Sequence, residues 1–336
     1  MLDNLRRPIR DLRISITDRC NFRCTYCMPK EIFGRDYPFL PRAEILTFEE
    51  IARLARIFVG LGVTKIRITG GEPLLRRDVD GLIRLLKTQE YAAGALNEVT
   101  LTTNGARLGV LAQSLVDAGL DRITVSLDSL DEDVFARMNG VDHPVSQVLA
   151  GIDAALAAGL QVKVNMVVQR SVNEDSILPM ARRFHGTGVI LRFIEYMDVG
   201  ATNGWQMADV VPAEEIVRLI DADLPIEPVD PNYQGEVARR YRYVDGGGEI
   251  GLITSVTNPF CGDCTRARLS ADGRLYTCLF AADGLDLRSV LRSESGDSHL
   301  SDTIRDIWRS RSDRYSELRS RQTAGLPKVE MSRIGG

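Results

Sequence analysis

The sequence predicts an α/β fold that consists of a partial (β/α)6 barrel and a smaller C-terminal α+β domain. Short runs rich in β-branched residues alternate with longer stretches of helical periodicity over about the first 220 residues, which is typical of parallel strands joined by crossover helices. Glycines, cysteines and charged residues follow the ends of these strands, and a barrel gathers such residues at one mouth. A plain parallel sheet would explain the alternation alone, so the second observation favours the barrel. The 336 residues provide enough chain for about two domains.

Six strands are predicted in the first domain, at residues 12–16, 65–69, 98–103, 122–127, 162–168 and 189–196. The helix expected at residues 47–62 begins with Thr47 and Glu50, which have the spacing of a capping box. Two further helices, at residues 107–119 and 145–159, each end at a glycine, as helices commonly do. The alternation therefore predicts six βα units in this domain.

The composition changes between residues 223 and 236, where three prolines and a glycine interrupt regular structure. We expect a barrel domain at residues 1–222, a proline-rich linker at 223–236 and a C-terminal domain at 237–336. Strands of this last domain are predicted at residues 237–243, 249–256, 267–270 and 274–279. A turn at residues 271–273 would join the last two strands and place Cys278 on the far arm of a hairpin. A serine-rich loop at 293–298 and a charged helix at about 303–321 would follow.

Gly246, Gly248 and Gly251 match by letter the glycine fingerprint of a dinucleotide-binding loop. They lie between two predicted strands, whereas the fingerprint needs to open a helix whose N-terminus binds the pyrophosphate. We therefore interpret this segment as a hairpin loop.

Charge and composition exclude several classes of function. The 42 basic and 46 acidic residues give a net charge of −4, so no strong positive field attracts nucleic acid or a membrane surface. The first 20 residues have no signal-peptide core, and no apolar run approaches the length of a membrane span. We expect a cytoplasmic protein. Only His143, His185 and His299 are present, and no hydrolase or Walker A motif occurs.

The six cysteines form two groups of three: Cys20, Cys24 and Cys27, and Cys261, Cys264 and Cys278. Three thiolates are one ligand short of a closed tetrahedral zinc site. In a four-iron cluster, three cysteines leave one iron open for a substrate or cofactor. Two structural zinc sites completed by distant residues remain the alternative.

Each predicted strand of the barrel ends near residues that are unusual for a simple turn. After the first strand come the cysteines, and the later strands are followed by or carry Gly70-Gly71-Glu72, Thr102-Thr103-Asn104-Gly105, Ser126-Leu127-Asp128, Lys163 with Asn165, and Arg192 with Glu195 and Met197. Since parallel barrel strands share one mouth at their C-terminal ends, we expect these residues to lie together.

Five cations are predicted in or beside this mouth: Arg13, Arg67, Lys163, Arg266 and Arg268. A buried cation needs a partner. The partners could be carboxylates of the protein, namely Glu72, Asp128 or Glu195, or an anionic substrate. Guanidinium groups suit phosphate because they bind it with two parallel hydrogen bonds. The cations and a cluster with an open iron together suggest a nucleoside triphosphate.

The segments C-N-F-R-C-T-Y-C and T-G-G-E-P resemble the cysteine loop and the glycine motif of the radical S-adenosylmethionine (SAM) superfamily. The segment T-R-A-R-L-S-A-D-G-R-L-Y-T-C-L and the terminal I-G-G are similar to those of GTP 3′,8-cyclases. The resemblance covers essentially the whole chain, with the motifs in the family's order. It implies a partial TIM-like barrel of the radical SAM type and a C-terminal domain that carries a second iron–sulfur cluster.

The resemblance also implies roles for individual residues. Two [4Fe-4S] clusters would be held by Cys20, Cys24 and Cys27 and by Cys261, Cys264 and Cys278, the second with guanine on its open iron. SAM would contact Tyr26, Gly71, Ser126 and Met197. GTP would bind Arg13, Arg67, Thr102 (or Thr103), Lys163, Arg266, Ala267 and Arg268, and Arg192, Gly335 and Gly336 are further candidates. No side chain is expected to act as a catalytic acid or base.

The implied activity is that of a radical SAM lyase in molybdenum cofactor biosynthesis. A 5′-deoxyadenosyl radical would take hydrogen from C3′ of GTP, and C3′ would close onto guanine C8 to give (8S)-3′,8-cyclo-7,8-dihydroguanosine 5′-triphosphate. The implied partners are an external one-electron reductant and a downstream cyclic pyranopterin monophosphate synthase. A homodimer is left open.

Three other classes of protein remain open at this stage. A radical SAM peptide-modifying enzyme with an auxiliary cluster would carry more C-terminal cysteines than three. A two-cluster electron-transfer protein would carry four cysteines for each cluster. A zinc-stabilised binding module would hold zinc and no iron.

Overall fold

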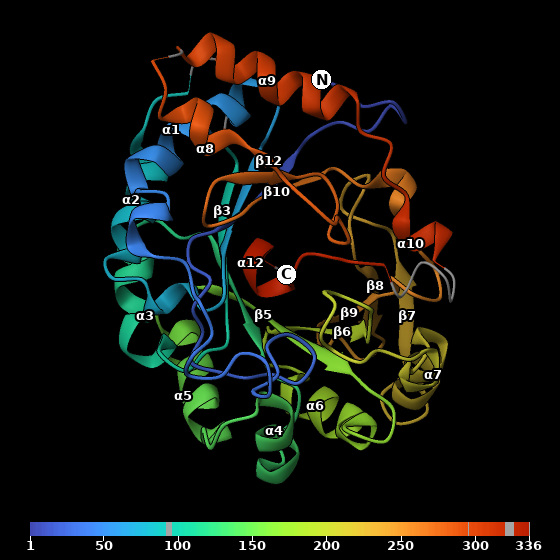
Figure 1. Cartoon of the computed structure of the whole chain (residues 1–336). Helices are drawn as coiled ribbons and strands as arrows, with labels where there is room; N and C mark the ends of the chain where they lie inside the picture. Colours follow the sequence, from blue (N-terminus) through green and yellow to red (C-terminus); the bar gives the residue numbers. More distant parts are fainter. Residues whose placement is uncertain (92–95, 295, 320–325, 336) are drawn as a thin grey trace.

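The computed structural model describes residues 1–91, 96–294, 296–319 and 326–335. Its strands form one twelve-stranded sheet in the order β12-β11-β10-β1-β2-β3-β4-β5-β6-β9-β8-β7. The sheet curves around an interior that contains the C-terminal helix α12 (Met331–Ile334), as Figure 1 shows. The curvature confirms the barrel-like α/β class, and the strands added at both edges make the sheet mixed.

Six consecutive strands run parallel and form the centre of the sheet: β1 (Asp11–Ser15), β2 (Lys65–Thr69), β3 (Glu98–Thr103), β4 (Arg122–Ser126), β5 (Gln161–Val168) and β6 (Ile190–Glu195). Their bounds agree with the predicted strands to within one residue at each end. Burial alternates along β5, where Val162, Val164 and Met166 are buried and Lys163 and Asn165 are partly exposed. This alternation sends one set of side chains to the helices and the other to the interior.

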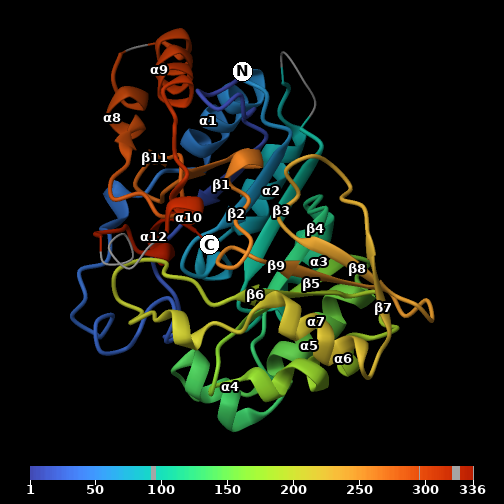
Figure 2. The same cartoon turned by 90° about the vertical axis from the view of Figure 1, so that its right-hand side faces the viewer.

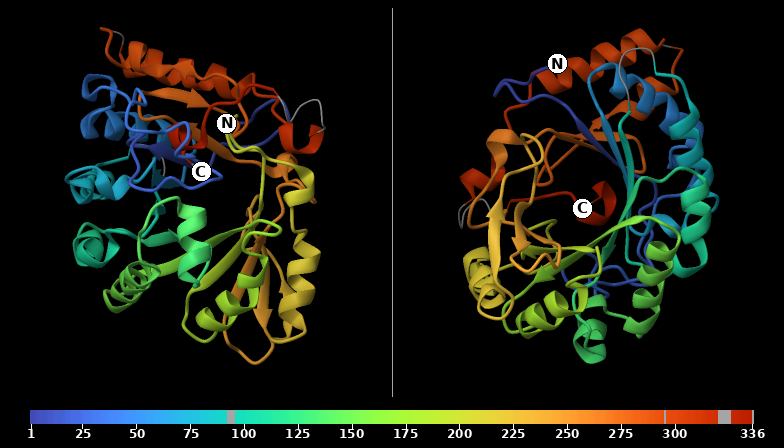
Figure 3. Two further views of the ribbon diagram at one scale, coloured as in Figure 1. Left: turned by 60° about the horizontal axis from the view of Figure 1, so that its bottom comes forward. Right: turned by 180° about the vertical axis from the view of Figure 1, so that it is seen from behind.

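Helices cover the outer face of these strands, as the two views of Figure 3 show. They are α1 (Phe48–Gly60), α2 (Val79–Thr88), α3 (Leu108–Asp117), α4 (Glu132–Asn139), α5 (Val145–Ala157) and α6 (Ile177–Phe184). The predicted capping box is present, because Thr47 and Glu50 exchange hydrogen bonds at the start of α1. Short 3-10 turns lie at Arg42–Glu44, Pro73–Leu75, Glu174–Ser176, Met207–Asp209 and Cys261–Asp263.

The last third of the chain extends the sheet at both edges. At one edge, β9 (Glu249–Ile253) pairs in parallel with β6 and is followed outward by β8 (Arg239–Tyr243) and β7 (Ile226–Val229). At the other edge, β10 (Arg266–Leu269) pairs in parallel with β1 and is followed by β11 (Arg274–Tyr276) and β12 (Leu285–Asp286). The two groups of strands lie at opposite ends of the sheet, with helices α8 (Leu287–Leu291) and α9 (Asp297–Arg309) beside the second group (Figure 2).

Three predictions for this region were wrong in detail. Residues 226–229 of the expected linker form strand β7, which accommodates Pro228 because an outermost strand has one edge without partners. The expected helix at 303–321 begins earlier, at Asp297, and ends at Arg309, and a separate short helix α10 (Tyr315–Leu318) follows. Strand β11 ends at Tyr276, so Cys278 lies beyond the hairpin arm. The division into two domains stays a prediction, while strands from both sides of the expected boundary share one sheet.

Helix α7 (Ala213–Asp221) leads from the barrel to β7. Among the described residues, no helix has both the length and the apolar character needed to cross a membrane.

Candidate functional site

A single cavity inside the curved sheet gathers most of the residues singled out in the sequence. All six cysteines line it, together with Tyr26, Gly71, Ser126, Met197, Arg13, Arg67, Thr102, Thr103, Lys163, Arg192, Arg266 and Arg268. The fold therefore brings both cysteine groups to one cavity, although their nearest members, Cys27 and Cys261, are 234 residues apart in the sequence.

Two further predicted site residues, Ala267 and Gly335, are not among the residues that line the cavity. Ala267 is buried in the hydrophobic core, because it alternates along β10 with Arg266 and Arg268, which line the cavity. Only its backbone remains a candidate for contact with a ligand. Gly335 lies beside β2, where its carbonyl oxygen accepts a hydrogen bond of 2.8 Å from Arg268. Gly336 is outside the described residues.

The first cysteine group lies in the loop after β1, held in a buried environment. Burial raises the pKa of the Cys20 thiol to about 12, and the carboxyl group of Glu72 adds to this effect. Burial also raises the pKa of Cys24 well above its usual value, and the nearby Cys20 and Cys27 thiols raise it further. Three buried thiols that influence one another become thiolates most readily when a metal centre supplies positive charge.

Gly71 explains how this loop can pack against the end of β2. A Cβ atom at Gly71 would lie 2.3 Å from the carbonyl oxygen of Arg19, so any larger residue would displace the cysteine loop. The amide of Gly71 also donates a hydrogen bond of 2.7 Å to the carbonyl oxygen of Thr17. The glycine motif therefore fixes the position of the cysteine loop in addition to lining the cavity.

The next residue, Glu72, points into the structure and is almost fully buried. Its carboxylate accepts hydrogen bonds from the Thr103 hydroxyl and from the amide of Asn104, both at 2.7 Å. Burial raises its pKa to about 7, although these hydrogen bonds oppose the increase. Glu72 thus connects the ends of β2 and β3. The Thr103 hydroxyl donates to Glu72, whereas the Thr102 hydroxyl accepts a hydrogen bond from Arg67.

Asp128 links the cysteine loop to the end of β4. The Tyr26 hydroxyl donates a hydrogen bond of 2.8 Å to its carboxylate, and the amide of Val167 donates another of 2.9 Å. Burial raises the pKa of Asp128 to about 6. Tyr26 is therefore held by its hydroxyl group while its ring packs with Met138 and Tyr196.

The strand register places three arginines in one row. Arg268 of β10, Arg13 of β1 and Arg67 of β2 are direct register partners across adjacent strands. Lys163 and Arg192 contribute further positive charge from β5 and β6. The cations therefore form an array across the inner face of the sheet.

The carboxylates proposed as internal partners do not neutralise this array. Glu72 and Asp128 make the hydrogen bonds given above, and Glu195 accepts hydrogen bonds from Ala213, Val256 and Thr257. Within the described ranges, no ion pair is found for Arg13, Arg67, Lys163, Arg192, Arg266 or Arg268. The buried Nε atoms of Arg13, Arg67 and Arg192 also have no hydrogen-bond partner there.

Burial and mutual repulsion both disfavour the charges of these cations. The pKa of Arg13 lies well below its usual value because of burial and the nearby Arg268 and Arg67. Burial, together with the positive charges of Arg122 and Arg192, lowers the pKa of Lys163 to about 7. A polyanion in the cavity would relieve both effects, since it would supply opposite charge and hydrogen-bond acceptors.

Two further cations were missed by sequence reasoning. Lys65 and Arg122 line the cavity, and both form ion pairs with Glu98, with N···O distances of 2.7 and 2.5 Å. Both residues are the first of their strands, whereas the site was expected at the C-terminal ends of the strands. The alternation of inward-facing residues along β2, Lys65 and Arg67, was the signal that could have identified the first of them.

The second cysteine group combines the turn at Cys261–Asp263, the start of β10 and the segment after β11. Burial raises the pKa of Cys278 to about 11. Cys264 behaves differently: burial alone would raise its pKa, but the charges of Arg266 and Arg311 outweigh burial and lower it to about 6. Both guanidinium groups donate hydrogen bonds to its sulfur, at 3.2 and 3.1 Å.

The donor set of both groups fits iron–sulfur clusters. Each consists of three thiols at one cavity, and cluster irons prefer thiolate ligands. No group of three or more histidine, cysteine, aspartate or glutamate side chains suited to a single metal ion occurs in the part of the chain that the structure describes. That finding concerns one ion with all its ligands, whereas each cysteine of a four-iron cluster binds a different iron.

Comparison with known protein families identifies the class. The family model for the radical SAM superfamily matches residues 14–184, about half of the chain, and the model described as Molybdenum Cofactor Synthesis C matches residues 189–317. The chain therefore belongs to the radical SAM superfamily of enzymes, which implies SAM and an iron–sulfur cluster. The first match lies within residues 1–222, where the partial barrel is expected.

Curated relatives narrow the class to one family. A GTP 3′,8-cyclase from Acidothermus cellulolyticus is 52% identical over 360 residues and covers 99% of this chain and 98% of its own. The GTP 3′,8-cyclases of Staphylococcus saprophyticus and Staphylococcus aureus strain MRSA252 are 51% and 50% identical over 338 residues, with the same coverage. The chain belongs to the GTP 3′,8-cyclase family, within molybdenum cofactor biosynthesis.

Solved structures with lower identity share the fold. The structure of Streptococcus suis SuiB bound to the precursor peptide SuiA has a TM-score of 0.60 and 14% identity, and covers 91% of this chain and 65% of that one. A second SuiB structure gives a TM-score of 0.57 at 14% identity, with 90% and 65% coverage. At this identity the similarity concerns the fold alone.

Proposed function

We propose that this chain converts GTP to (8S)-3′,8-cyclo-7,8-dihydroguanosine 5′-triphosphate with the residues identified above. The observation that carries the proposal is the array of buried and half-buried cations that, among the described residues, form no ion pair with a carboxylate and that share one cavity with two groups of three cysteines. Such an array suits a triphosphate, because phosphate oxygens accept several charge-assisted hydrogen bonds at once.

In this proposal Cys20, Cys24 and Cys27 hold the first cluster, and SAM lies between it and the ends of β2, β4 and β6. Gly71, Ser126 and Met197 line that part of the cavity, and Tyr26 is fixed there by its hydrogen bond to Asp128. In the proposal, the bound SAM and nucleotide fill this cavity and so keep water from the radical.

Cys261, Cys264 and Cys278 hold the second cluster, on the side of the cavity formed by β10. Its fourth iron has no cysteine ligand and is available to the guanine base. Arg266 lies between this group and the arginine row, since it hydrogen-bonds to Cys264 and neighbours Arg268 on the same face of β10. A nucleotide that spans from the cluster to the row would meet base-binding and phosphate-binding groups in that order.

Arg13, Arg67, Lys163 and Arg268 bind the triphosphate, with Arg192 as a further contact and Thr102 as a hydroxyl donor. Arg67 already donates a hydrogen bond of 3.2 Å to the Thr102 hydroxyl, so the two side chains lie at one position of the cavity. The contribution of these residues is to fix the ribose so that C3′ faces the radical source.

When bound, SAM and the first cluster would supply the 5′-deoxyadenosyl radical that removes hydrogen from C3′. Bonding of C3′ to guanine C8 would then leave a nucleotide radical, which needs one further electron, from the external reductant, and one proton to give the dihydro product. The side chains position the nucleotide, neutralise its phosphate charge and enclose the reacting atoms. The proposal assigns no side chain as the acid or base. An external one-electron reductant, a downstream cyclic pyranopterin monophosphate synthase, a homodimer and a cytoplasmic location belong to the same proposal.

The decisive experiment uses anaerobic, cluster-reconstituted protein with dithionite, SAM and GTP deuterated at C3′. Mass spectrometry is expected to find deuterium in 5′-deoxyadenosine, with loss of GTP in equal amount. An Arg67→Gln/Arg268→Gln variant should still cleave SAM slowly but leave GTP intact. Undeuterated 5′-deoxyadenosine from the unaltered protein, with GTP unchanged, would reject the substrate and keep only the superfamily.

A further inference from the structure

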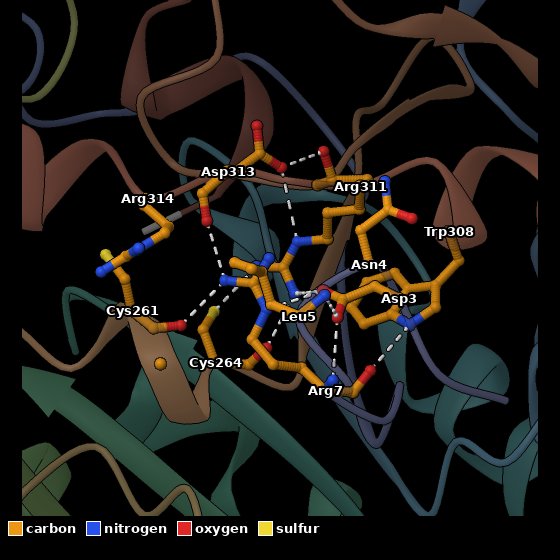
Figure 4. Close-up of polar contacts among 12 residues, drawn as sticks. Asp3, Asn4, Leu5, Arg7, Cys261, Cys264, Trp308, Arg311, Asp313 and Arg314 are labelled. Carbon is orange, nitrogen blue, oxygen red and sulfur yellow. Dashed lines mark hydrogen bonds and ion pairs between the residues drawn. The ribbon is translucent and has the colours of Figure 1, made fainter.

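A polar network made by the N-terminal residues and the segment after α9 surrounds the second cysteine group. It joins the N-terminal residues Asp3 and Arg7, the segment after α9 with Arg311 and Asp313, and the loop that carries Cys261 and Cys264 (Figure 4). The network therefore ties the N-terminal residues and the segment after α9 to one loop.

Arg7 holds the backbone of this loop. Its Nη1 donates hydrogen bonds of 2.8 Å to the carbonyl oxygens of Cys261 and Asp313, and its Nε donates one of 2.6 Å to Asp3. Arg7 is 2% exposed and Asp3 is 6% exposed. The amide of Arg10 donates a further hydrogen bond of 3.0 Å to the carbonyl oxygen of Thr265. The first ten residues are thus a structural part of the second cysteine site.

Arg311 contacts Cys264 at two atoms. Its Nη1 donates a hydrogen bond of 2.7 Å to the Cys264 carbonyl oxygen, and its Nη2 donates one of 3.1 Å to the sulfur. Its guanidinium group stacks over the Trp308 ring, 4.6 Å from the centroid, and lies 3.4 Å from a carboxylate oxygen of Asp3. The side chain is 1% exposed, so its orientation toward the sulfur is fixed by neighbours on every side.

Asp313 extends the network toward the third cysteine. Its carboxylate lies 3.4 Å from Nε of Arg311 and accepts a hydrogen bond of 2.6 Å from the hydroxyl of Thr277, which precedes Cys278. Cys261, Cys264 and the neighbour of Cys278 are therefore each held by a member of the same network.

We propose that Arg311 is a positioning residue that raises the reduction potential of the second cluster, and that Asp3 limits this effect by offsetting its charge. The inference rests on the proposed second cluster. A positive N–H donor at a cluster thiolate withdraws negative charge from it, which stabilises the reduced, more negative form. Arg266 also donates to Cys264, but it belongs to the cation array for the nucleotide, whereas Arg311 faces the sulfur from the side of the terminal segments.

The test is a potentiometric titration followed by electron paramagnetic resonance. It uses the full chain with Cys20→Ala, Cys24→Ala and Cys27→Ala, so that only the second cluster contributes to the signal. In this background Arg311→Gln is expected to lower the midpoint potential, and Arg311→Lys, which keeps the charge and loses the forked geometry, to lower it less. Arg309→Gln is the matched control, because Arg309 is exposed and only two residues away.

Asp3→Asn is expected to shift the midpoint potential upward, opposite to Arg311→Gln. Loosening of the site would move both variants in the same direction, so opposite shifts distinguish an electrostatic role from a structural one. Failure of the background protein to bind iron and sulfide would refute the second cluster and the inference with it. A bound cluster whose potential is unchanged in both Arg311 variants, or that shifts alike in Arg311→Gln and Asp3→Asn, would refute the inference alone.

Discussion

The affinity for GTP is expected to depend on the protonation of Lys163. In the ligand-free protein burial and the neighbouring cations Arg122 and Arg192 hold the pKa of Lys163 near 7. A bound triphosphate raises that pKa, because it supplies the missing negative charge. Binding above pH 7 must therefore take up a proton, and the affinity is greatest at or below pH 7 and falls as the pH rises toward the pKa of the complex.

The size of the Lys163 contribution follows from the titration of that group considered by itself. With a free-state pKa near 7, Lys163 is about nine-tenths neutral at pH 8, so GTP binding should take up about 0.9 proton there. Between pH 7 and pH 9 the affinity should fall roughly 50-fold, provided that the pKa in the complex is above 9. The arginines contribute little to this slope because they stay protonated in proteins.

Isothermal titration calorimetry measures the proton uptake directly, from the dependence of the binding enthalpy on the ionisation enthalpy of the buffer. Lys163→Met is expected to bind GTP more weakly at pH 7 and to show no proton uptake at pH 8. Lys30→Met replaces an exposed lysine and should behave as the unaltered protein does. A pH-independent affinity in the unaltered protein, or the same proton uptake in Lys163→Met, would refute the reasoning.

Three further substitutions test other parts of the structure. Arg13→Met removes a cation whose charge is disfavoured by burial and by the nearby Arg268 and Arg67. The melting temperature of the ligand-free protein should rise, while the affinity for GTP should fall at least about tenfold. A lower melting temperature would contradict the claim that this charge destabilises the ligand-free protein. Gly71→Ala places a Cβ atom 2.3 Å from the Arg19 carbonyl oxygen. Denaturant titration should show a loss of about 1–3 kcal/mol in the free energy of unfolding, and the first cysteine group should bind less iron. The control Gly81→Ala, whose Cβ would meet no atom within 4 Å, should have neither effect. Asp198→Asn removes the carboxylate that accepts hydrogen bonds of 2.8 and 3.1 Å from the buried Arg319 and Lys328. The free energy of unfolding should fall by about 3–5 kcal/mol, and proteolysis of the C-terminal segment should be faster. An unchanged proteolysis rate would show that this segment is held by other contacts.

Much of the fold was predictable because its signals are local. The six parallel strands were predicted from short β-branched runs, and the start of α1 from a capping box, since both depend on residues close in sequence. The edge strand β7 was missed because Pro228 normally argues against a strand, and only its outermost place in the sheet makes the proline acceptable. The end of the predicted helix at 303–321 was wrong because Arg311 and Asp313 contact Cys264 and Thr277, 47 and 36 residues earlier in the chain, which the local pattern does not show.

The candidate site divides in the same way. The sequence by itself determined the two groups of cysteines, the glycine motif and the family, because cluster ligands and close backbone approach require particular residue types at particular spacings. Only the tertiary structure decided that Arg268, Arg13 and Arg67 stand in one row, since strand register is set by long-range pairing. It also decided that Glu72, Asp128 and Glu195 are occupied elsewhere, which leaves the cations for a ligand. The packing of Arg7 and Arg311 against Cys261 and Cys264 has no local sequence signal, because it arises from contacts between residues 47 to 306 positions apart.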